Sequence, residues 1–389
     1  MKPWDAIILG AGAYGLMTAV IAGRRGKRVL ILERNEQAGK KILISGGGRC
    51  NYTNLNTRAE NFISDNPRFI HNILSRWSVQ DTLDFFGVYG IEPQEKTLGQ
   101  LFPVSNKAKD FRDGMLNEAL MLGAEIIYGV RIAAVEHSEG MFTVQSQDGT
   151  VWSAPAVVVA TGGKTIPAMG ATDFGMTLAS QFGLPLIPDT PALVPFAAGE
   201  QDLALCESLA GMAIDANAAI RKQSFREQIL FTHKGWSGPA ILQISSYWNP
   251  GQTVLLDLLP DVPEAEILSG KGVAAISLKE FLPSRWVQHL VITFPFLVKN
   301  IQEISKKDKE KVLKFLKQFE VHPEDTLGYA KAEVMKGGVD TRALNPKTLE
   351  ARNIPGLYFG GEVTDVTGWL GGYNFQWAWA CGAVTGNAI

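Results

Sequence analysis

The sequence contains few cysteines and no long apolar segment. Its three cysteines, Cys50, Cys206 and Cys381, are far apart in 389 residues and form no CxxC pair. This excludes a disulfide framework, a zinc site built on cysteine pairs and a dithiol redox centre, and it favours a reducing compartment. No apolar run reaches the roughly 18 residues needed to cross a bilayer. Asp5 interrupts the apolar N-terminal stretch, which argues against a secretion signal. We therefore expect a cytoplasmic protein.

The sequence also lacks an excess of charge of one sign, internal repeats and low-complexity segments. Its 37 Lys and Arg residues nearly balance 39 Asp and Glu residues, so the whole molecule has no general attraction for nucleic acid, although a local basic patch is compatible with this balance. Hydrophobic content of 46% indicates a globular protein with a substantial core and room for two or three domains. Forty glycines, many in short clusters, indicate places where the backbone approaches a ligand closely.

The N-terminal segment has the pattern of a dinucleotide-binding turn: an apolar strand, the turn Gly10–Gly15, a helix, and an apolar strand over 29–32 that ends at Glu33. In such a turn Gly10 allows the sharp bend, and Gly12 lets the backbone approach a pyrophosphate. Gly15 lets the helix pack closely on the sheet, and the helix N-terminus, including Ala13 and Tyr14, offers N–H groups to the anion. A carboxylate at position 33 suits ribose hydroxyls and disfavours a 2′-phosphate, so the pattern predicts FAD or NAD. A chance glycine turn is the alternative, which the strand–helix–strand context disfavours.

Two more segments favour FAD over NAD. Residues 160–163 (Ala160, Thr161, Gly162, Gly163) are small and end a buried strand, although a plain turn would also explain them. Near the C-terminus, residues 356–362 form a strand and glycine turn with Glu362 and Asp365 positioned for ribityl hydroxyls. The N–H groups near 372–374 would then face the flavin pyrimidine edge. A cofactor that both chain ends bind is long, as FAD is. Because no second GxGxxG follows a strand, we expect NADH or NADPH to bind only transiently.

A third polar, glycine-rich segment spans residues 40–54. It combines three glycines with Arg49, Cys50 and Asn51, which can surround the pyrophosphate and approach the isoalloxazine; the alternative is a flexible surface turn. A similar cluster at 231–240 contains His233, an acid–base candidate, although a lone histidine is more often structural.

The pattern of apolar residues, prolines and charges divides the chain into three parts. Residues 1–189 are α/β in pattern, with strands expected over 124–136, 141–145 and 156–163, and they end in a proline cluster. Short strands follow, and then a helical stretch in which Val312, Phe315, Leu316 and Phe319 form one apolar face. Seven lysines against four acids give residues 299–320 a net charge of +3. A solvated helix face is one interpretation, and a phosphate-binding surface is the other.

The whole chain resembles the bacterial YhiN-like (BaiN-type) flavoproteins, also called aminoacetone-oxidase-type FAD-binding enzymes. The resemblance covers the chain nearly end to end. It rests on residues 10–15, 39–51, 230–233 with 237–239, 332–341, 356–362 and 371–379. Residues 96–102 and 366–370 resemble the YhiN branch in particular. Met335 and Lys336 depart from the Thr-Leu expected before Gly337, which puts contacts on the substrate face in doubt.

The resemblance implies an α/β fold: a glutathione-reductase-like Rossmann-type FAD domain with an inserted β-rich domain that itself carries a helical insertion. The expected boundaries are 1–189 and 347–389 for the FAD domain, 190–260 and 326–346 for the β-rich substrate domain, and 261–325 for the helical insertion. Taken with the motifs, it implies no metal and the following cofactor-binding residues: Gly10, Gly12, Ala13, Tyr14, Gly15, Glu33, Arg34, Lys41, Ser45, Gly48, Arg49, Asn51, Val130, Ala160, Thr161, Gly162, Gly361, Glu362, Asp365, Gly372, Tyr373 and Asn374.

The YhiN branch implies an FAD-dependent dihydrouridine synthase that reduces a uridine C5=C6 bond in large-subunit ribosomal RNA with electrons from NAD(P)H. For the proton donor we expect Cys50 first, then His233 and Tyr373; Cys50 as a small packing residue is the alternative. Trp236, Tyr373 and Trp377 are candidates for an aromatic mouth around an unstacked base, or for core. Lysines within 299–317 would contact ribosomal RNA.

Two other functions stay open at this point. One is a small-molecule flavin enzyme, for instance for aminoacetone-type amine oxidation or enone reduction. The other is a non-enzymatic RNA-binding factor that FAD stabilises. The residues themselves predict an FAD oxidoreductase and do not choose the substrate.

Overall fold

The computed structural model describes residues 3–389, which form two compact units. The first unit contains the chain up to Thr190 together with Val334–Ile389, and the second unit contains Pro191–Glu333. The boundary falls inside strand β12 (Leu186–Ala192), in the proline cluster at which the sequence predicts a domain exit. The two chain ends therefore build one unit together.

A five-stranded parallel sheet is the centre of the first unit, in the order β21-β11-β1-β2-β7. Its strands are β1 (Ala6–Leu9), β2 (Val29–Leu32), β7 (Glu125–Ile127), β11 (Val157–Val159) and β21 (Leu357–Phe359). Four of the five are buried at every residue, as parallel strands covered on both faces are. Because the strands are parallel, the glycine turns that follow β1, β11 and β21 lie at the same edge of the sheet.

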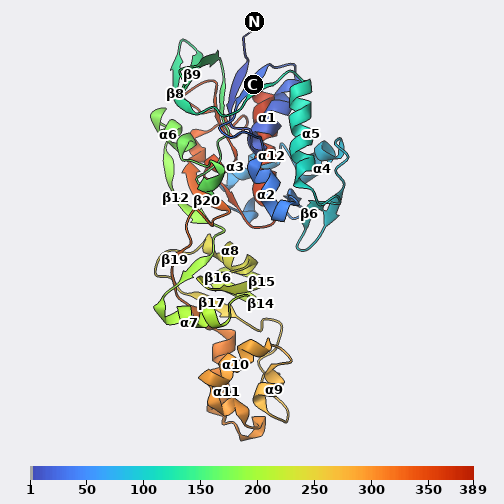
Figure 1. Cartoon of the computed structure of the whole chain (residues 1–389), viewed down its shortest axis with the longest axis vertical. Coiled ribbons are helices and arrows are strands. Elements are labelled where there is room, and N and C mark those ends of the chain that lie inside the picture. Colours follow the sequence, from blue (N-terminus) through green and yellow to red (C-terminus); the bar gives the residue numbers. More distant parts are fainter. Residues whose placement is uncertain (1–2) are drawn as a thin grey trace. The chain divides into compact units, whose positions relative to one another are not determined.

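Helices α1 (Ala13–Arg24) and α12 (Tyr373–Ala388) run side by side in the first unit (Figure 1). Glycines on α12 allow the close approach: a Cβ at Gly382 would lie 2.5 Å from the Cβ of Met17. The Tyr14 hydroxyl and the Thr385 hydroxyl are 2.9 Å apart, which joins the first and last helices. The other helices of this unit are α2 (Lys40–Gly48), α3 (Pro67–Leu74), α4 (Val79–Gly87), α5 (Ala108–Met121) and α6 (Phe174–Gln181).

Four small sheets complete the first unit. They are β8 (Ile132–Ser138) with β9 (Met141–Ser146) and β10 (Val151–Ala154); β3 (Thr53–Asn54) with β6 (Gln100–Pro103) and β5 (Pro93–Glu95); β4 (Phe62–Ile63) with β22 (Thr367–Gly368); and β12 with β20 (Val334–Val339). The prediction of one strand over 124–136 is wrong. Gly129 adopts φ +74° and lies in a bend that separates β7 from β8.

The second unit is built on a seven-stranded sheet in the order β18-β17-β14-β15-β16-β13-β19. Its strands are β13 (Phe196–Ala198), β14 (Ala213–Ile220), β15 (Gln223–Thr232), β16 (Gly235–Ser237), β17 (Val254–Asp257), β18 (Phe319–Val321) and β19 (Pro323–Thr326). Helices α7 (Glu200–Ser208) and α8 (Pro239–Ser245) belong to the same unit. The antiparallel hairpin of β14 and β15 alternates buried and exposed residues along β14, as expected for a sheet with one covered face.

Between β17 and β18 the chain forms a helical segment of α9 (Ala274–Leu278), α10 (Ser284–Thr293) and α11 (Lys306–Lys317). Trp286 of α10 is fully buried and packs on Phe231 of β15 and on Phe319, with ring centroids 5.5 and 5.7 Å apart. Val312 and Leu316 of α11 are buried as predicted, but Phe319 belongs to β18, so the expected helical face is wrong at this residue. None of the helices that the structure describes is long and apolar enough to cross a membrane.

Candidate cofactor site

Gly10, Gly12 and Gly15 of the first turn are glycines for different physical reasons. Gly10 adopts φ +110°, and a Cβ there would lie 2.5 Å from the Ala160 carbonyl oxygen; a Cβ at Gly15 would lie 2.0 Å from the Gly10 carbonyl oxygen. Packing therefore requires both glycines. Gly12 has ordinary extended angles, φ −82° and ψ −168°, and a Cβ there would meet no protein atom within 4 Å. The protein itself gives no reason for glycine at position 12, whereas a ligand above the N-terminus of α1 does.

The Glu33 carboxylate lies at this turn. It is 7% exposed, accepts the Ala11 N–H at 2.7 Å, and accepts the backbone and side-chain N–H groups of Asn35 at 2.7 and 2.8 Å. Val130 donates its N–H to the Glu33 carbonyl at 3.0 Å, so this candidate adjoins the same strand end. An open hollow of about 540 Å³ lies beside them; it is lined by Arg34, Asn35, Glu36, Gln37 and Lys40. This region provides an open hollow and an acid, as the predicted adenosine end of a dinucleotide requires.

A second carboxylate, Glu362, joins three segments of the first unit. It follows β21 in the short helix Gly361–Val363 and accepts the Lys41 ammonium at 2.7 Å and the Thr165 hydroxyl at 2.8 Å. The Lys41 ammonium also lies 2.6 Å from the Thr165 hydroxyl oxygen. The Met335 N–H completes the contacts of this carboxylate at 3.3 Å. Thr165 is absent from the sequence-predicted residues; its one signal is that it closely follows the glycine pair that ends β11.

Two buried polar atoms in this region have no hydrogen-bond partner among the described residues: the Thr161 hydroxyl and the Asn51 side-chain oxygen. Leaving such an atom unsatisfied costs about 1–3 kcal/mol. The Asn51 side-chain amide donates a hydrogen bond to the Gln100 side-chain oxygen at 2.9 Å, so the unsatisfied atom is its oxygen. Both residues come from the segments predicted to bind FAD, and both can hydrogen-bond a ligand. The residues present therefore fit a bound dinucleotide.

The polar segment predicted at 40–54 departs from helical geometry within the bounds of α2. Ser45 leaves the helix, and Gly46 and Gly47 adopt left-handed angles of φ +55° and +68°. Cys50 is fully buried, and burial raises the pKa of its thiol to about 12, against a smaller opposing effect of its hydrogen bond with Ser45. The Arg49 side chain is exposed and donates to the Gly46 carbonyl at 2.9 Å. Arg49 therefore carries a charge at the surface, beside the buried Cys50.

The N-terminus of α12 meets this segment. A Cβ at Gly372, which has φ +98°, would lie 2.4 Å from the Thr53 carbonyl oxygen and 2.9 Å from the Asn51 side-chain oxygen. Tyr373 is 6% exposed and begins α12. The Asn374 side chain is bonded within its own turn, since it accepts the Gly368 N–H at 2.8 Å and donates to the Gly368 carbonyl at 2.9 Å. A cofactor contact of Asn374 would therefore have to use its backbone.

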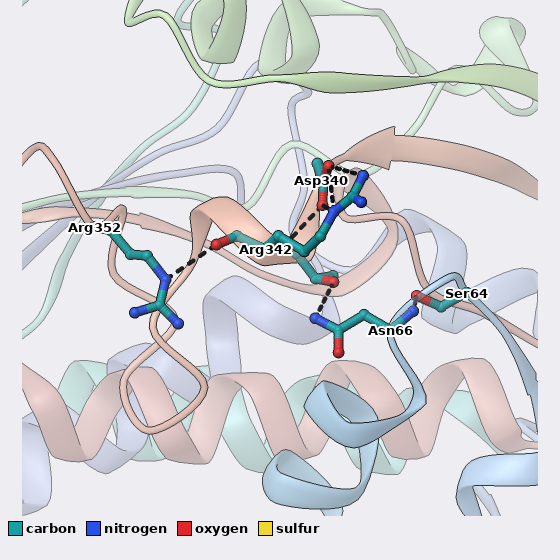
Figure 2. Close-up of polar contacts among 6 residues, drawn as sticks. Ser64, Asn66, Asp340, Arg342 and Arg352 are labelled. Carbon is teal, nitrogen blue, oxygen red and sulfur yellow. Dashed lines mark hydrogen bonds and ion pairs between the residues drawn. The ribbon is translucent and has the colours of Figure 1, made fainter.

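Asp365 lies in a different environment from Glu362. Burial raises the pKa of its carboxyl group to about 6, and the nearby charges of Asp65 and Asp340 act in the same direction, while Lys336 opposes them. Figure 2 shows part of this region: Arg342 grips Asp340 with its guanidinium at 2.6–2.9 Å, and Asn66 donates to the Thr341 hydroxyl at 3.1 Å. The Asn66–Thr341 bond joins the loop before α3 to the loop after β20. The structure thus groups Asp365 with other acids, apart from the Lys41–Glu362 pair.

The remaining candidates divide between the two units. His233 is exposed in the turn between β15 and β16 of the second unit. Trp236 of the second unit is 0% exposed and Trp377 of the first is 1% exposed, so both are core residues and the expectation of an aromatic mouth fails for them. Cys50 and Tyr373 share the first unit with the predicted cofactor-binding residues.

The parallel sheet, the glycine turn at its carboxyl edge and the use of both chain ends define a Rossmann-type dinucleotide-binding protein. The chain belongs to the HI0933-like family, whose model, described as "HI0933-like protein Rossmann domain", matches residues 4–388. Within this family it is an FAD-dependent oxidoreductase.

Two curated relatives and one solved structure resemble the whole chain. "Ribosomal RNA dihydrouridine synthase" of Escherichia coli is 41% identical over 98% of this chain and 96% of its own length. "3-dehydro-bile acid delta(4,6)-reductase" of Clostridium scindens is 32% identical over 98% of both chains. The structure of a 3-ketosteroid-delta4-(5alpha)-dehydrogenase from Rhodococcus jostii superposes with a TM-score of 0.50 at 14% identity, covering 99% of this chain and 97% of that one, and shows the shared fold.

Proposed function

We propose that this chain reduces the C5=C6 bond of a uridine in large-subunit ribosomal RNA to give dihydrouridine, with NAD(P)H as the source of electrons. The observation that carries the proposal is the 41% identity to a ribosomal RNA dihydrouridine synthase over nearly the full length of both chains. The intact cofactor features support it: the open space above Gly12, the acid Glu33, and the unsatisfied oxygens of Asn51 and Thr161.

FAD, when bound, would supply a hydride to the substrate alkene. The residues of this chain would hold it in separate ways. The N–H groups at the start of α1 would bind the pyrophosphate, Glu33 the adenosine ribose, and Glu362 with Lys41 the ribityl chain. The contacts would thus come from the N-terminal turn with β2, from α2, and from the segment after β21, all of which belong to the first unit.

The chain must also give a proton to the second alkene carbon. A donor must be protonated at neutral pH and able to lose that proton when the substrate is bound. Cys50 meets the first condition, since burial raises the pKa of its thiol, but the same burial opposes formation of the thiolate. Tyr373 and His233 stay the other candidates. Separate Cys50→Ala, Tyr373→Phe and His233→Asn variants distinguish them, because loss of the true donor lowers turnover while flavin reduction by NAD(P)H continues.

A small-molecule reductase is the second candidate function. It is favoured by the 32% identity to a bile acid reductase over 98% of both chains. The two substrates share a feature, because uridine C5=C6, like the alkene of an enone, is conjugated to a carbonyl. A reductase of steroid-like enones would oxidise NAD(P)H with such a substrate and would leave ribosomal RNA unchanged.

Mapping of dihydrouridine in ribosomal RNA tests the proposal. Mild alkali opens the saturated ring, and reverse transcriptase then stops at that position. In a strain that lacks this gene, one stop should disappear, and it should return with the wild-type gene but not with a Gly12→Ala variant. If every stop persists in the deletion strain, the proposal is wrong. If the Gly12→Ala variant restores the stop although it no longer binds FAD, the role of the chain is non-enzymatic.

A further inference from the structure

Cations of the second unit are concentrated on one helix. Pro191–Glu333 contains fifteen Lys and Arg residues and seventeen Asp and Glu residues, a net charge of −2. Six of those cations and only two of the acids lie within the twelve residues of α11. The helix therefore has a net charge of +4, and the rest of the unit has −6. An even solvated surface would not separate the charges in this way.

The lysines of α11 form a stripe on its outer face. Lys307, Lys311 and Lys314 are exposed and follow one another at spacings of four and three residues, which places them on one side of the helix. Val312 and Leu316 are buried on the opposite side, against the rest of the second unit. The stripe is about 10 Å long, at 1.5 Å per residue. Packing fixes which face of α11 points outward, and that face is cationic.

Half of the lysines have an acid close by. The pairs are Lys306–Glu310 at 3.9 Å, Lys311–Asp308 at 2.8 Å and Lys317–Asp257 at 3.3 Å. Lys307, Lys309 and Lys314 have no acid within 4 Å among residues 3–389. Exposed pairs of this kind are worth about 0–1 kcal/mol, so Lys306 and Lys311 are also available to another anion. Lys317 also bonds the Leu259 carbonyl and serves the packing of the segment.

Two of the six lysines of α11 oppose the helix dipole, whereas Lys314 and Lys317 lie in the last turn, where a positive charge is favourable. Lys306 and Lys307 occupy the first turn of α11, where a positive charge is unfavourable by about 0.3–1 kcal/mol. Ser305 caps this end by accepting the Asp308 N–H at 3.1 Å, and Asp308 offsets part of the charge. Lys307 thus extends the cationic stripe to the N-terminal end of α11, although its charge does not stabilise the helix itself.

We infer that the outer face of α11 binds the phosphate backbone of the RNA substrate. The inference rests on the proposed function for the presence of RNA, and on the charge and geometry of α11 for the location of the contact. Lysine ammonium groups bind phosphates as point charges without reading sequence, so this surface holds the RNA while other residues select the base. The expected partner of this surface is therefore RNA phosphate rather than a protein.

A protein partner would use a different part of the same segment. Ile276 of α9, Ile292 of α10 and Val298 are 63%, 77% and 60% exposed, and they carry no charge. Substitution of these three residues therefore separates an apolar contact from the phosphate contact proposed for α11.

The test is a measurement of binding of the holoenzyme to deproteinised large-subunit ribosomal RNA between about 50 and 200 mM salt. The variant is Lys307→Gln, Lys311→Gln and Lys314→Gln together. A matched control carries Lys107→Gln, Lys109→Gln and Lys347→Gln, which remove the same charge from exposed positions of the first unit. One lysine of each set is paired with an acid: Lys109 lies 3.8 Å from Asp113, and Lys311 lies 2.8 Å from Asp308. The two variants therefore each lose one ion pair. Flavin absorbance and circular dichroism verify that each variant is loaded and folded.

The α11 variant should lose at least about tenfold in affinity at ~0.1 M salt, and its log–log salt slope should become shallower by about 2 to 3. The control should match the wild type, and Glu310→Gln should bind more tightly than the wild type because it removes a negative charge from the stripe. Equal binding by the α11 variant and the control would overturn the inference. Loss of RNA binding on changing Ile276, Ile292 and Val298 to Ser, with the lysine variant unaffected, would overturn it as well. If the wild type itself does not bind this RNA, the proposed RNA substrate fails together with the surface.

Discussion

The predicted cofactor site of the first unit and helix α11 of the second unit depend on different parts of the chain for binding, the backbone in one and the side chains in the other. In the first unit the predicted cofactor site depends on backbone packing, because a Cβ at several of its glycines would lie only 2–3 Å from atoms of another segment. Two buried side-chain oxygens there have no hydrogen-bond partner among the described residues. On α11 the proposed RNA contact depends on side chains, since six lysines lie on a helix whose backbone is ordinary. Changes in the first unit should therefore act sterically and abruptly, and changes on α11 should act in small, salt-dependent steps.

The largest effect is expected at Gly15. A Gly15→Val variant places Cβ 2.0 Å from the Gly10 carbonyl oxygen, so α1 must shift away from the turn. We expect a loss of about 3 kcal/mol or more in unfolding free energy and a protein purified without flavin. Thermal unfolding and flavin absorbance measure both. Gly87→Ala is the control, because a Cβ there would meet no atom within 4 Å. A Gly15→Val protein with normal flavin content would contradict the steric account.

A smaller effect is expected at Glu362. The Glu362→Gln variant keeps the size of the side chain but removes the charge that accepts the Lys41 ammonium at 2.7 Å. Charged hydrogen bonds contribute about 1.5–3 kcal/mol, so the Kd for FAD should rise by about tenfold or more, as measured by titration of the apoprotein. Glu118→Gln is the matched control, since Glu118 also pairs with a cation, Arg24, at 2.6 Å in the same unit. Equal FAD affinity of the two variants would remove Glu362 from the site.

Asp365 should make stability depend on pH. Its carboxyl group has a pKa of about 6 in the folded protein, above the value near 3.9 of an unfolded chain. The folded state therefore binds this proton more tightly than the unfolded chain does. The resulting contribution to the free energy of unfolding is fully present below about pH 4 and is lost as the pH rises through about 6. Asp365→Asn should be about 1 kcal/mol more stable than the wild type at pH ~7.5 and no more stable at pH ~4. Urea unfolding at both pH values measures the difference.

A difference of the opposite sign at Asp365 would show that its interaction with Lys336 outweighs its burial and the nearby charges of Asp65 and Asp340. The account of this acid group would then be wrong, although the account of Glu362 would not change.

The smallest effect on folding and on FAD is expected from α11. The triple variant at Lys307, Lys311 and Lys314 should change unfolding free energy by less than about 1 kcal/mol, because exposed substitutions away from caps and cores usually do. Its Kd for FAD should equal that of the wild type. If neutralising these lysines changes FAD binding, the division of roles between the two regions is wrong.

Much of the first unit could be predicted from the sequence, because its signals are local. The strand, glycine turn and helix at residues 5–24 and the return of the chain at 356–388 each carry their own pattern. The sequence does not indicate the break at Gly129, because apolar residues continue on both sides of it. Helical spacing continues past Lys317 into β18, so the pattern wrongly predicts Phe319 to be helical.

The contacts between distant segments could not be predicted in this way. Thr165 and Glu362 are 197 residues apart, and no pattern in either segment indicates that their side chains meet. The acid group around Asp365 likewise forms only when the loops before α3 and after β20 come together. The position of α11 lysines on one face follows from spacing, but which face is buried depends on Trp286 and the sheet beneath it.

The most direct test of the central claim, that the N-terminal turn binds the cofactor, is an FAD titration of the Gly12→Ala apoprotein together with its unfolding. Gly12 has extended angles and a Cβ there would meet no protein atom within 4 Å. We expect an unfolding free energy within about 1 kcal/mol of the wild type and an FAD affinity at least about tenfold weaker. Unchanged FAD affinity would show that no ligand approaches Gly12, and the assignment of this turn as the pyrophosphate site would be wrong.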